Sequence, residues 1–218
     1  RHSMRDMLRQ RIFGLACGYA DANDAARLAD DPLHKLAVGR DPVIGAALAS
    51  QPTLSRFEHA MSPRALYRAS RTLAATVIAH HRARLNGRAQ RITIDLDPTD
   101  DPTHGQQELT FFNGHYDAWC YLPLVATLTF NDEVEQYLVA IVLRPGNSSA
   151  KRGASGLLRS LVRCLRRAFP EATLRVRVDG GFAGNDWLEV LETQRVEYVV
   201  GVASNARLVQ RAGRLLGE

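Results

Sequence analysis

The stretch that decides the fold is residues 91–97, RITIDLD. Apolar and polar side chains alternate along it, which is the period of a strand with one buried face and one polar face. Two further apolar stretches follow, CYLPLVATLTF (120–130) and EQYLVAIVLRPG (135–146), and the polar turn NDEVE separates them. Three successive strands of this kind predict an antiparallel meander.

Downstream of the meander, helices alternate with strands. An amphipathic helix is predicted over residues 154–169, and TLRVRVDGGFA (173–183) reads as a strand that runs into a glycine pair. NDWLEVLETQ (185–194) predicts a short helix, EYVVGVA (197–203) a strand and ASNARLVQRAGRLL (203–216) a final helix. This order predicts an α/β fold, a ribonuclease H-like mixed five-stranded sheet with flanking helices, although other α/β folds share the order of elements.

Residues 1–90 read as helices instead. Apolar residues recur at three- to four-residue spacing in MRDMLRQRIFGLACGY (4–19) and SPRALYRASRTLAATVIAHHRARL (62–85). This part has 14 basic and 7 acidic side chains, a net charge of +7, whereas residues 91–218 have 14 basic and 16 acidic side chains, a net charge of −2, which together give the overall +5. We therefore predict a basic helical segment, 1–90, that faces a polyanion such as DNA, and a domain that concentrates carboxylates, 91–218. Because 26 of the 28 basic residues are arginine, a compositional bias of the genome explains the charge equally well.

Composition excludes several classes of protein. No apolar run approaches the roughly 20 residues that a transmembrane helix needs, and residues 1–20 lack the apolar run of a secretory leader. The three cysteines have no CxxC spacing, which fits a reducing compartment and neither a disulfide framework nor a zinc knuckle. We expect a cytoplasmic protein that does not associate with a membrane.

Three aspartates stand on the predicted strands or at their ends. Asp95 and Asp97 are two residues apart and share the face opposite to the apolar row, and Asp179 ends RVRVD just before the glycine pair. In a sheet whose first and fourth strands are neighbours, Asp97 and Asp179 lie side by side. Adjacent carboxylates repel unless a cation lies between them, and oxygen ligands suit Mg²⁺ or Mn²⁺. The alternative is that each is an ordinary strand-end or turn residue.

Several separate motifs run in order over most of the chain: DPLHKLAVGRDP, LASQPTLSRFE, IDLDPTDDPTHGQQ, CYLPL, LRPGN, RVRVDGGFA and YVVGVASNARL. In these motifs the chain resembles bacterial insertion-sequence transposases with a DDE-type catalytic domain, specifically the insertion-sequence 1380 family. The resemblance implies metal-dependent cleavage at a transposon end, followed by attack of the freed 3′-hydroxyl on target DNA. It implies double-stranded DNA as the partner, both terminal inverted repeats and target, and a homo-oligomer on paired ends at the bacterial nucleoid.

The resemblance also implies roles for the acids. The family's first catalytic aspartate stands in an Asp-x-Thr-like context, which Asp97 matches in DPT, and its second stands in an Asp-Gly-Gly context, which Asp179 matches. Both are expected to hold Mg²⁺ or Mn²⁺ in a two-metal site, and Asp95 is the rival for the first position. The third acid, a glutamate, is expected further downstream. Glu218 is a conceivable ligand, but truncation of the chain before this acid is the preferred explanation.

Basic side chains near the strand ends are the predicted contacts to DNA phosphates, namely Arg144 in LRPGN and Lys151 and Arg152 in a polar loop. For the four arginines of the 154–169 helix, a solvated helix face is slightly favoured. The predicted function is that of a DNA transposase, with the fragment itself expected to be inactive. Two alternatives stay open: a non-catalytic DNA-binding remnant or domesticated regulator, and a ribonuclease H-like nuclease or resolvase unrelated to transposition.

Overall fold

A computed structural model describes residues 2–202 and 206–216. The chain divides into two compact units, Arg1–Leu66 (unit 1) and Tyr67–Glu218 (unit 2). The division falls earlier than the predicted one at residue 90, because most of helix α5 (Pro63–Arg84) belongs to the core of unit 2. Its buried side chains Ala74 and Ile78 pack into the same apolar cluster as the strands.

Unit 1 is helical, as predicted, and consists of α1 (Met4–Ala16), α2 (Ala25–Leu28), α3 (Pro32–Val38) and α4 (Gln51–His59). The Ser3 hydroxyl caps α1 by accepting a hydrogen bond from the Asp6 amide at 3.1 Å, and Gly39 ends α3 in the left-handed conformation that favours glycine. Buried Gln10 fixes the segment before α4, since its side chain donates to the Ala49 carbonyl at 2.8 Å and accepts from the Ala49 amide at 2.9 Å.

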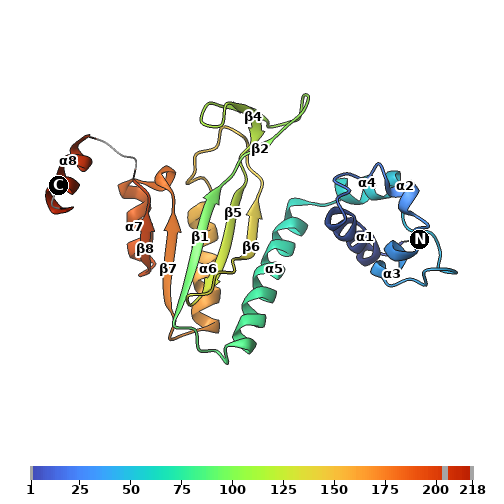
Figure 1. The fold of residues 1–218 in the computed structure, drawn as a ribbon, viewed down its shortest axis with the longest axis horizontal. Helices are drawn as coiled ribbons and strands as arrows, with labels where there is room; N and C mark the ends of the chain where they lie inside the picture. The colour runs from blue at the N-terminus through green and yellow to red at the C-terminus, as the bar shows by residue number, and fades with distance from the viewer. Residues whose placement is uncertain (1, 203–205, 217–218) are drawn as a thin grey trace. The chain divides into compact units, whose positions relative to one another are not determined.

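Unit 2 is built on a mixed five-stranded sheet (Figure 1). Its strands are β1 (Arg91–Pro98), β5 (Leu124–Phe130), β6 (Tyr137–Val142), β7 (Thr173–Val178) and β8 (Glu197–Val200). They lie in the order β6-β5-β1-β7-β8, with β1 antiparallel to β5 and parallel to β7. This is the ribonuclease H-like arrangement of a three-stranded meander extended by two parallel strands, which confirms the predicted fold.

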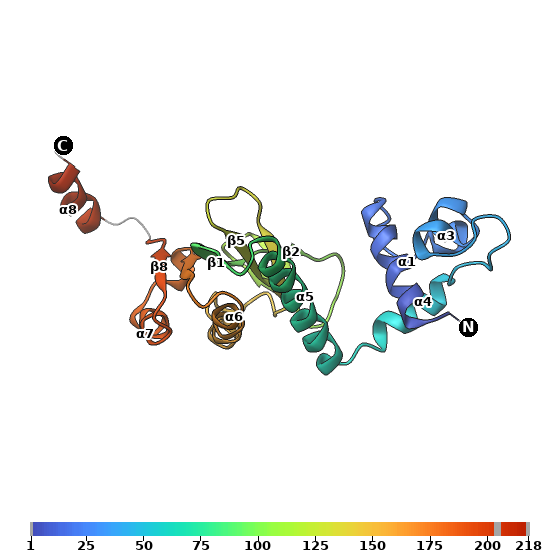
Figure 2. The same cartoon turned by 90° about the horizontal axis from the view of Figure 1, so that it is seen from below.

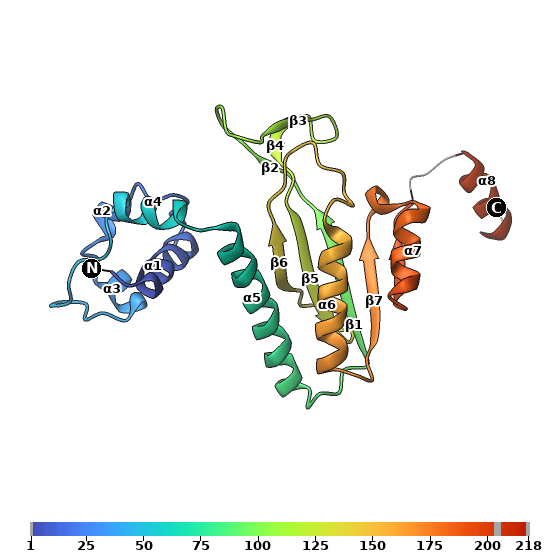
Figure 3. The same cartoon turned by 180° about the vertical axis from the view of Figure 1, so that it is seen from behind.

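The three helices α5, α6 (Ala154–Ala168) and α7 (Asn185–Thr193) lie on one side of this sheet (Figures 2 and 3). The alternation in RITIDLD explains why they pack there, since Ile92, Ile94 and Leu96 are at most 1% exposed beneath them. The opposite face carries Asp95 and Asp97. One further helix is described, α8 (Ala206–Leu216). No helix in the described ranges is both long and apolar enough to cross a membrane.

A second, small sheet extends from the carboxyl end of β1. It consists of β2 (Asp101–Pro102), β3 (Phe111–Asn113) and β4 (Ala118–Tyr121) in the order β2-β4-β3. The sequence predicted strand character only from Cys120 onward, because β2 and β3 are too short to show a period. The small sheet forms most of the connection between β1 and β5, and it brings residues 114–117, the turn between β3 and β4, back toward β1.

Candidate active site

Asp97 and Asp179 lie at the carboxyl ends of two neighbouring parallel strands. The register of β1 and β7 pairs Asp95 with Arg177 and Leu96 with Val178. Asp179 has an extended backbone (φ −79°, ψ −177°), so it continues the direction of β7 by one residue. The next opposed positions are therefore Asp97 and Asp179, which places the two predicted carboxylates side by side at one edge of the sheet, where β1 and β7 end in Figure 1.

The electrostatics of Asp97 reflect this crowding. Burial raises the pKa of Asp97, and the negative charges of Asp179 and Asp95 raise it further, in that order of size. No cation and no hydrogen-bond donor within the described chain contacts the Asp97 carboxylate. A carboxylate that lies beside another and has no protein partner has the properties expected of a ligand for an external cation.

Asp95 shares the face of Asp97 but has a partner. The Arg177 guanidinium on β7 binds the Asp95 carboxylate through two nitrogens, one of them Nη2 at 3.1 Å from Oδ2. This ion pair raises the pKa of Arg177. The side chain of Asp95 is engaged by the neighbouring strand, whereas that of Asp97 is not.

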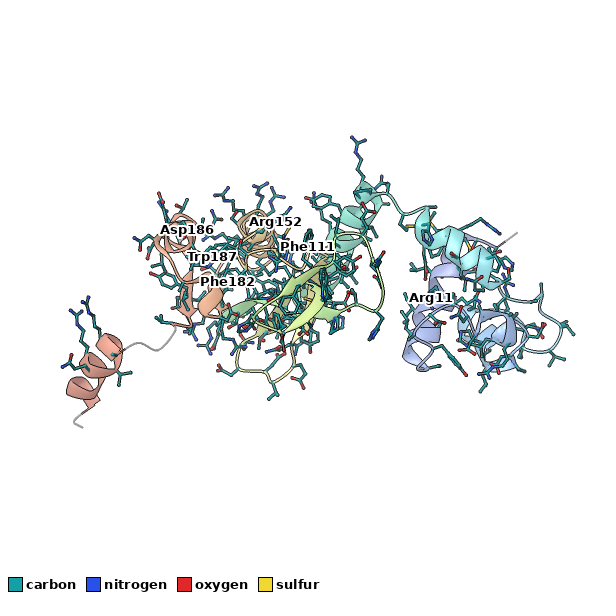
Figure 4. All side chains as sticks on the ribbon, turned by 90° about the horizontal axis from the view of Figure 1, so that it is seen from above. Arg11, Phe111, Arg152, Phe182, Asp186 and Trp187 are labelled. Carbon is teal, nitrogen blue, oxygen red and sulfur yellow. The ribbon has the colours of Figure 1, made fainter. Side chains whose placement is uncertain are left out.

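The turn after Asp179 is held in place by local contacts. The Asp179 Oδ1 accepts a hydrogen bond from the Gly181 amide at 3.0 Å and so caps the 3₁₀ turn Gly180–Phe182. Phe182 and Trp187, both labelled in Figure 4, are buried with ring centroids 5.0 Å apart, which anchors the far end of the turn on α7. Asp179 is thus fixed between the end of β7 and a packed aromatic pair.

Gly201 completes the backbone around Asp179. Its amide donates to the Val178 carbonyl at 2.9 Å, and a Cβ atom at this position would lie 3.0 Å from the Gly180 nitrogen and 3.3 Å from the Asp179 Cα. Only glycine allows this approach without displacing the backbone of Asp179. The role of Gly201 was not predicted; its signal in the sequence is a glycine directly after the apolar run of β8.

Tyr116 lies near the acids as well. Its hydroxyl donates to the Pro98 carbonyl at 3.2 Å. Burial, followed by the charges of Asp100, Asp97 and Asp179, raises the pKa of Tyr116. A protonated phenol therefore stands near the carboxylate pair. The sequence does not show that Tyr116 lies near Asp97, because the two are brought together only by the pairing of the short strands β2, β3 and β4.

The three predicted basic contacts differ in their surroundings. Arg144 is 4% exposed, and its guanidinium donates to the carbonyls of Leu122, Ser149, Ala150 and Arg152, so it holds the loop before α6 together. Lys151 Nζ lies 2.6 Å from a carboxylate oxygen of Asp186 in the first turn of α7 and lowers the pKa of Asp186. Arg152 is exposed and unpaired with any described carboxylate (Figure 4).

The two aspartates are ligands of the type that a divalent cation binds, but a complete site needs more ligands than these two. Two adjacent aspartates offer hard oxygen ligands of the type that Mg²⁺ binds. Within residues 2–202 and 206–216 no group of three or more metal-binding side chains comes together. Glu218, the conceivable third ligand, lies outside the described residues.

Comparison with known proteins assigns the family. The model of the transposase DDE domain, group 1, matches residues 1–217. The chain belongs to this family of DDE transposase domains. A search of curated proteins found no match.

Among solved structures, this DDE domain is similar to the Mos1 transposase paired-end complex with left transposon end, at 12% identity and a TM-score of 0.32, covering 99% of this chain and 66% of that one. It is also similar to the Drosophila P element transposase strand transfer complex, at 11% identity and a TM-score of 0.35, covering 88% and 44%. A third structure, the simian T-cell lymphotropic virus intasome in complex with PP2A regulatory subunit B56 gamma, has 12% identity and a TM-score of 0.32, with 59% and 39% covered. The domain thus spans less than two thirds of the length of these chains.

Proposed function

We propose that the chain is the DDE domain of a bacterial insertion-sequence transposase of the insertion-sequence 1380 family, and that it takes part in metal-dependent DNA cleavage and strand transfer. The observation that carries the proposal is the pairing of Asp97 with Asp179 at the ends of adjacent parallel strands. The family match over residues 1–217 supports it. The finer family name rests on the motifs IDLDPTDDPTHGQQ and RVRVDGGFA.

Asp97 and Asp179 are the residues proposed to hold Mg²⁺ or Mn²⁺. A bound divalent cation would supply activation of the attacking oxygen and neutralisation of charge on the leaving oxygen. The protein contributes the positions of the two carboxylates: Gly181 fixes Asp179 through its amide, and the Asp95–Arg177 ion pair beneath Asp97 occupies the rival carboxylate. Asp97 is therefore preferred to Asp95 for the first position. Glu218, which lies outside the described residues, stays the candidate for a third carboxylate within this chain.

The proposed partner is double-stranded DNA, as terminal inverted repeats and as target. Arg152 is the exposed basic residue of the three predicted contacts, and Lys151 is available at the cost of its ion pair with Asp186. Arg144 is left out of the interface because it is buried. A homo-oligomer on paired ends, working at the nucleoid in the cytoplasm, remains part of the proposal.

The test uses the complete element-encoded protein and a labelled duplex that carries the transposon end. Mg²⁺-dependent cleavage is expected, and it should be lost in Asp179→Ala and Asp97→Ala. Glu189→Ala is the matched control, since it removes an exposed acid of α7 that has no ion pair among the described residues. Undiminished cleavage by Asp179→Ala refutes the assignment. Salt-dependent DNA binding without any nicking by the complete protein supports the non-catalytic regulator instead.

A further inference from the structure

The exposed face of α6 carries four arginines in a row. The sequence places them at positions 159, 163, 166 and 167, which share one side of a helix, while Leu158, Leu161 and Leu165 are at most 3% exposed on the other side. The helix is fixed to the sheet by this apolar side, so the arginine side points away from it. The row spans nine residues, and its first and last members are about 12 Å apart along the helix axis.

These arginines line a hollow between α6 and the end of α7. Its volume is about 390 Å³, and its lining is made by Arg159, Val162, Arg163, Arg166, Arg167 and Gln194. We call this feature the arginine groove. One guanidinium, that of Arg166, donates to the carbonyls of Gln194 and Arg195, which fixes the wall between the two helices. The groove is therefore a shaped feature of the surface and not merely a run of charge in the sequence.

None of the four guanidiniums forms an ion pair within the described part of the chain. The contrast with the open face of the sheet is direct, because Arg175 and Arg177 there each bind a carboxylate on a neighbouring strand. Four like charges around one hollow repel each other, and an anion placed among them removes that repulsion.

The shape of the groove selects the anion. Val162 is its one apolar lining residue, and no aromatic ring lines it, so a nucleobase or other flat ligand finds no stacking surface. The charges follow a line instead of converging on a point. A strand of duplex DNA presents its phosphate charges in a line, one for each nucleotide, which matches cations that are arranged in a line.

We propose that the arginine groove binds the phosphate backbone of duplex DNA, as a second contact separate from the carboxylate pair. The identification of DNA as the polyanion rests on the proposed function. The separation rests on the fold: α7 begins just after the turn that follows Asp179, and Gln194 stands at the opposite end of that helix. DNA in the groove lies along the helix layer, away from the strand ends.

The experiment measures binding of this chain to a short fluorescent duplex of arbitrary sequence, by anisotropy, in EDTA and over a range of salt. The test variant replaces Arg159, Arg163, Arg166 and Arg167 by glutamine. The control replaces four other arginines by glutamine, namely Arg5, Arg56, Arg64 and Arg88, all exposed and without a described carboxylate partner. Both variants lose the same net charge. A variant that spares Arg166 is added, because loss of its two carbonyl contacts can loosen α7.

Each arginine that neutralises a phosphate contributes about 0.9 to the slope of log affinity against log salt, so the groove variant should lose up to about 3.6. The ratio of wild-type affinity to variant affinity should therefore fall on the order of 100-fold as salt rises from about 50 to about 200 mM. The control variant should change far less, and the three-arginine variant should lose about 2.7 in slope. Four lysines in place of the arginines should retain most of the binding.

Wild-type affinity in the groove variant, or an equal loss in the control, overturns the proposal. So does competition by poly-glutamate as strong as that by DNA of equal charge, which would make the groove a site for acidic protein segments. Binding in EDTA and Mg²⁺-dependent cleavage are measured separately, the first with the groove variant and the second with Asp179→Ala. Failure of the cleavage proposal and failure of the groove proposal therefore give different results: the first is seen in the cleavage assay, and the second in DNA binding.

Discussion

Replacing Asp97 by asparagine should stabilise unit 2 in metal-free buffer. The pKa of Asp97 is raised by burial and by the charges of Asp179 and Asp95, so the folded state holds this proton more tightly than the unfolded state does. The ionised carboxylate at neutral pH is thus a cost to folding. Stability of the wild type should fall as pH rises from the unfolded pKa through the raised folded value, and Asp97→Asn should lack this loss.

The spacing of the strands sets the size of the contribution from the charge of Asp179. Neighbouring strands lie about 4.8 Å apart. Two unit charges at that distance repel by about 0.9 kcal/mol at the dielectric constant of water, which is the appropriate choice because Asp179 is exposed. A gain of about 1 kcal/mol corresponds to a rise in Tm of about 2–4 °C for a body of this size.

Asp95→Asn is the matched control, since it is the same change on the same face of the same strand. It removes the ion pair with Arg177 and should lower stability by about 0.5–1 kcal/mol, because the Arg177 side chain is about half exposed. Thermal and urea unfolding in EDTA at neutral pH compare the two variants with wild type. Millimolar Mg²⁺ should then raise the Tm of wild type and leave that of Asp97→Asn unchanged. Shifts of the same sign in both variants, or a destabilised Asp97→Asn, refute the reasoning.

Three other changes have defined outcomes. Gly201→Ala places a Cβ against the backbone of Asp179 and should cost about 1–3 kcal/mol in urea unfolding, with loss of Mg²⁺-dependent cleavage in the complete protein; unaltered stability would contradict the close approach. Arg144→Met leaves buried carbonyls without their donor and should cost about 3 kcal/mol or more, whereas a surface DNA contact would change salt-dependent binding and not Tm. His81 is 1% exposed, stacks on Phe130 and has a pKa lowered by burial and by Arg84, so stability should drop as pH falls through the ordinary histidine pKa toward the lowered one; His81→Phe should abolish that drop in pH-dependent melts.

The strands and the carboxylate pair were predictable because each depends on a local pattern. The alternation in RITIDLD fixes which side chains of β1 are buried, and its two-residue period places Asp95 and Asp97 on one face. A parallel neighbour for β1 follows from the order of elements, and it brings Asp179 beside Asp97. These steps need only the period of a strand and the rules of strand connection.

The features that the sequence did not reveal depend on tertiary contacts. Arg144 looked like a surface cation because the sequence cannot show that four backbone carbonyls converge on its guanidinium. Asp95 was predicted as the rival of Asp97, and the sequence could not show that the register pairs Asp95 with Arg177, 82 residues away. The boundary at residue 90 followed the change from helix to strand, but α5 packs on the sheet and belongs with it.

This placement of α5 changes the meaning of the charge asymmetry. Residues 1–66 carry nine basic and seven acidic side chains, a net charge of +2, whereas residues 67–90 carry five basic side chains and no acidic one. Most of the basic excess therefore belongs to unit 2 and lies on the helix layer, which also carries the four arginines of the arginine groove. On the open face, Arg91, Arg175 and Arg177 are each neutralised by a carboxylate. The division between a polyanion-facing part and a carboxylate part is thus a division within unit 2, between the helix layer and the strand ends. Binding of duplex DNA to the helix layer does not require unit 1. The DNA affinity of residues 67–218 alone should therefore retain most of the salt dependence seen with the whole chain.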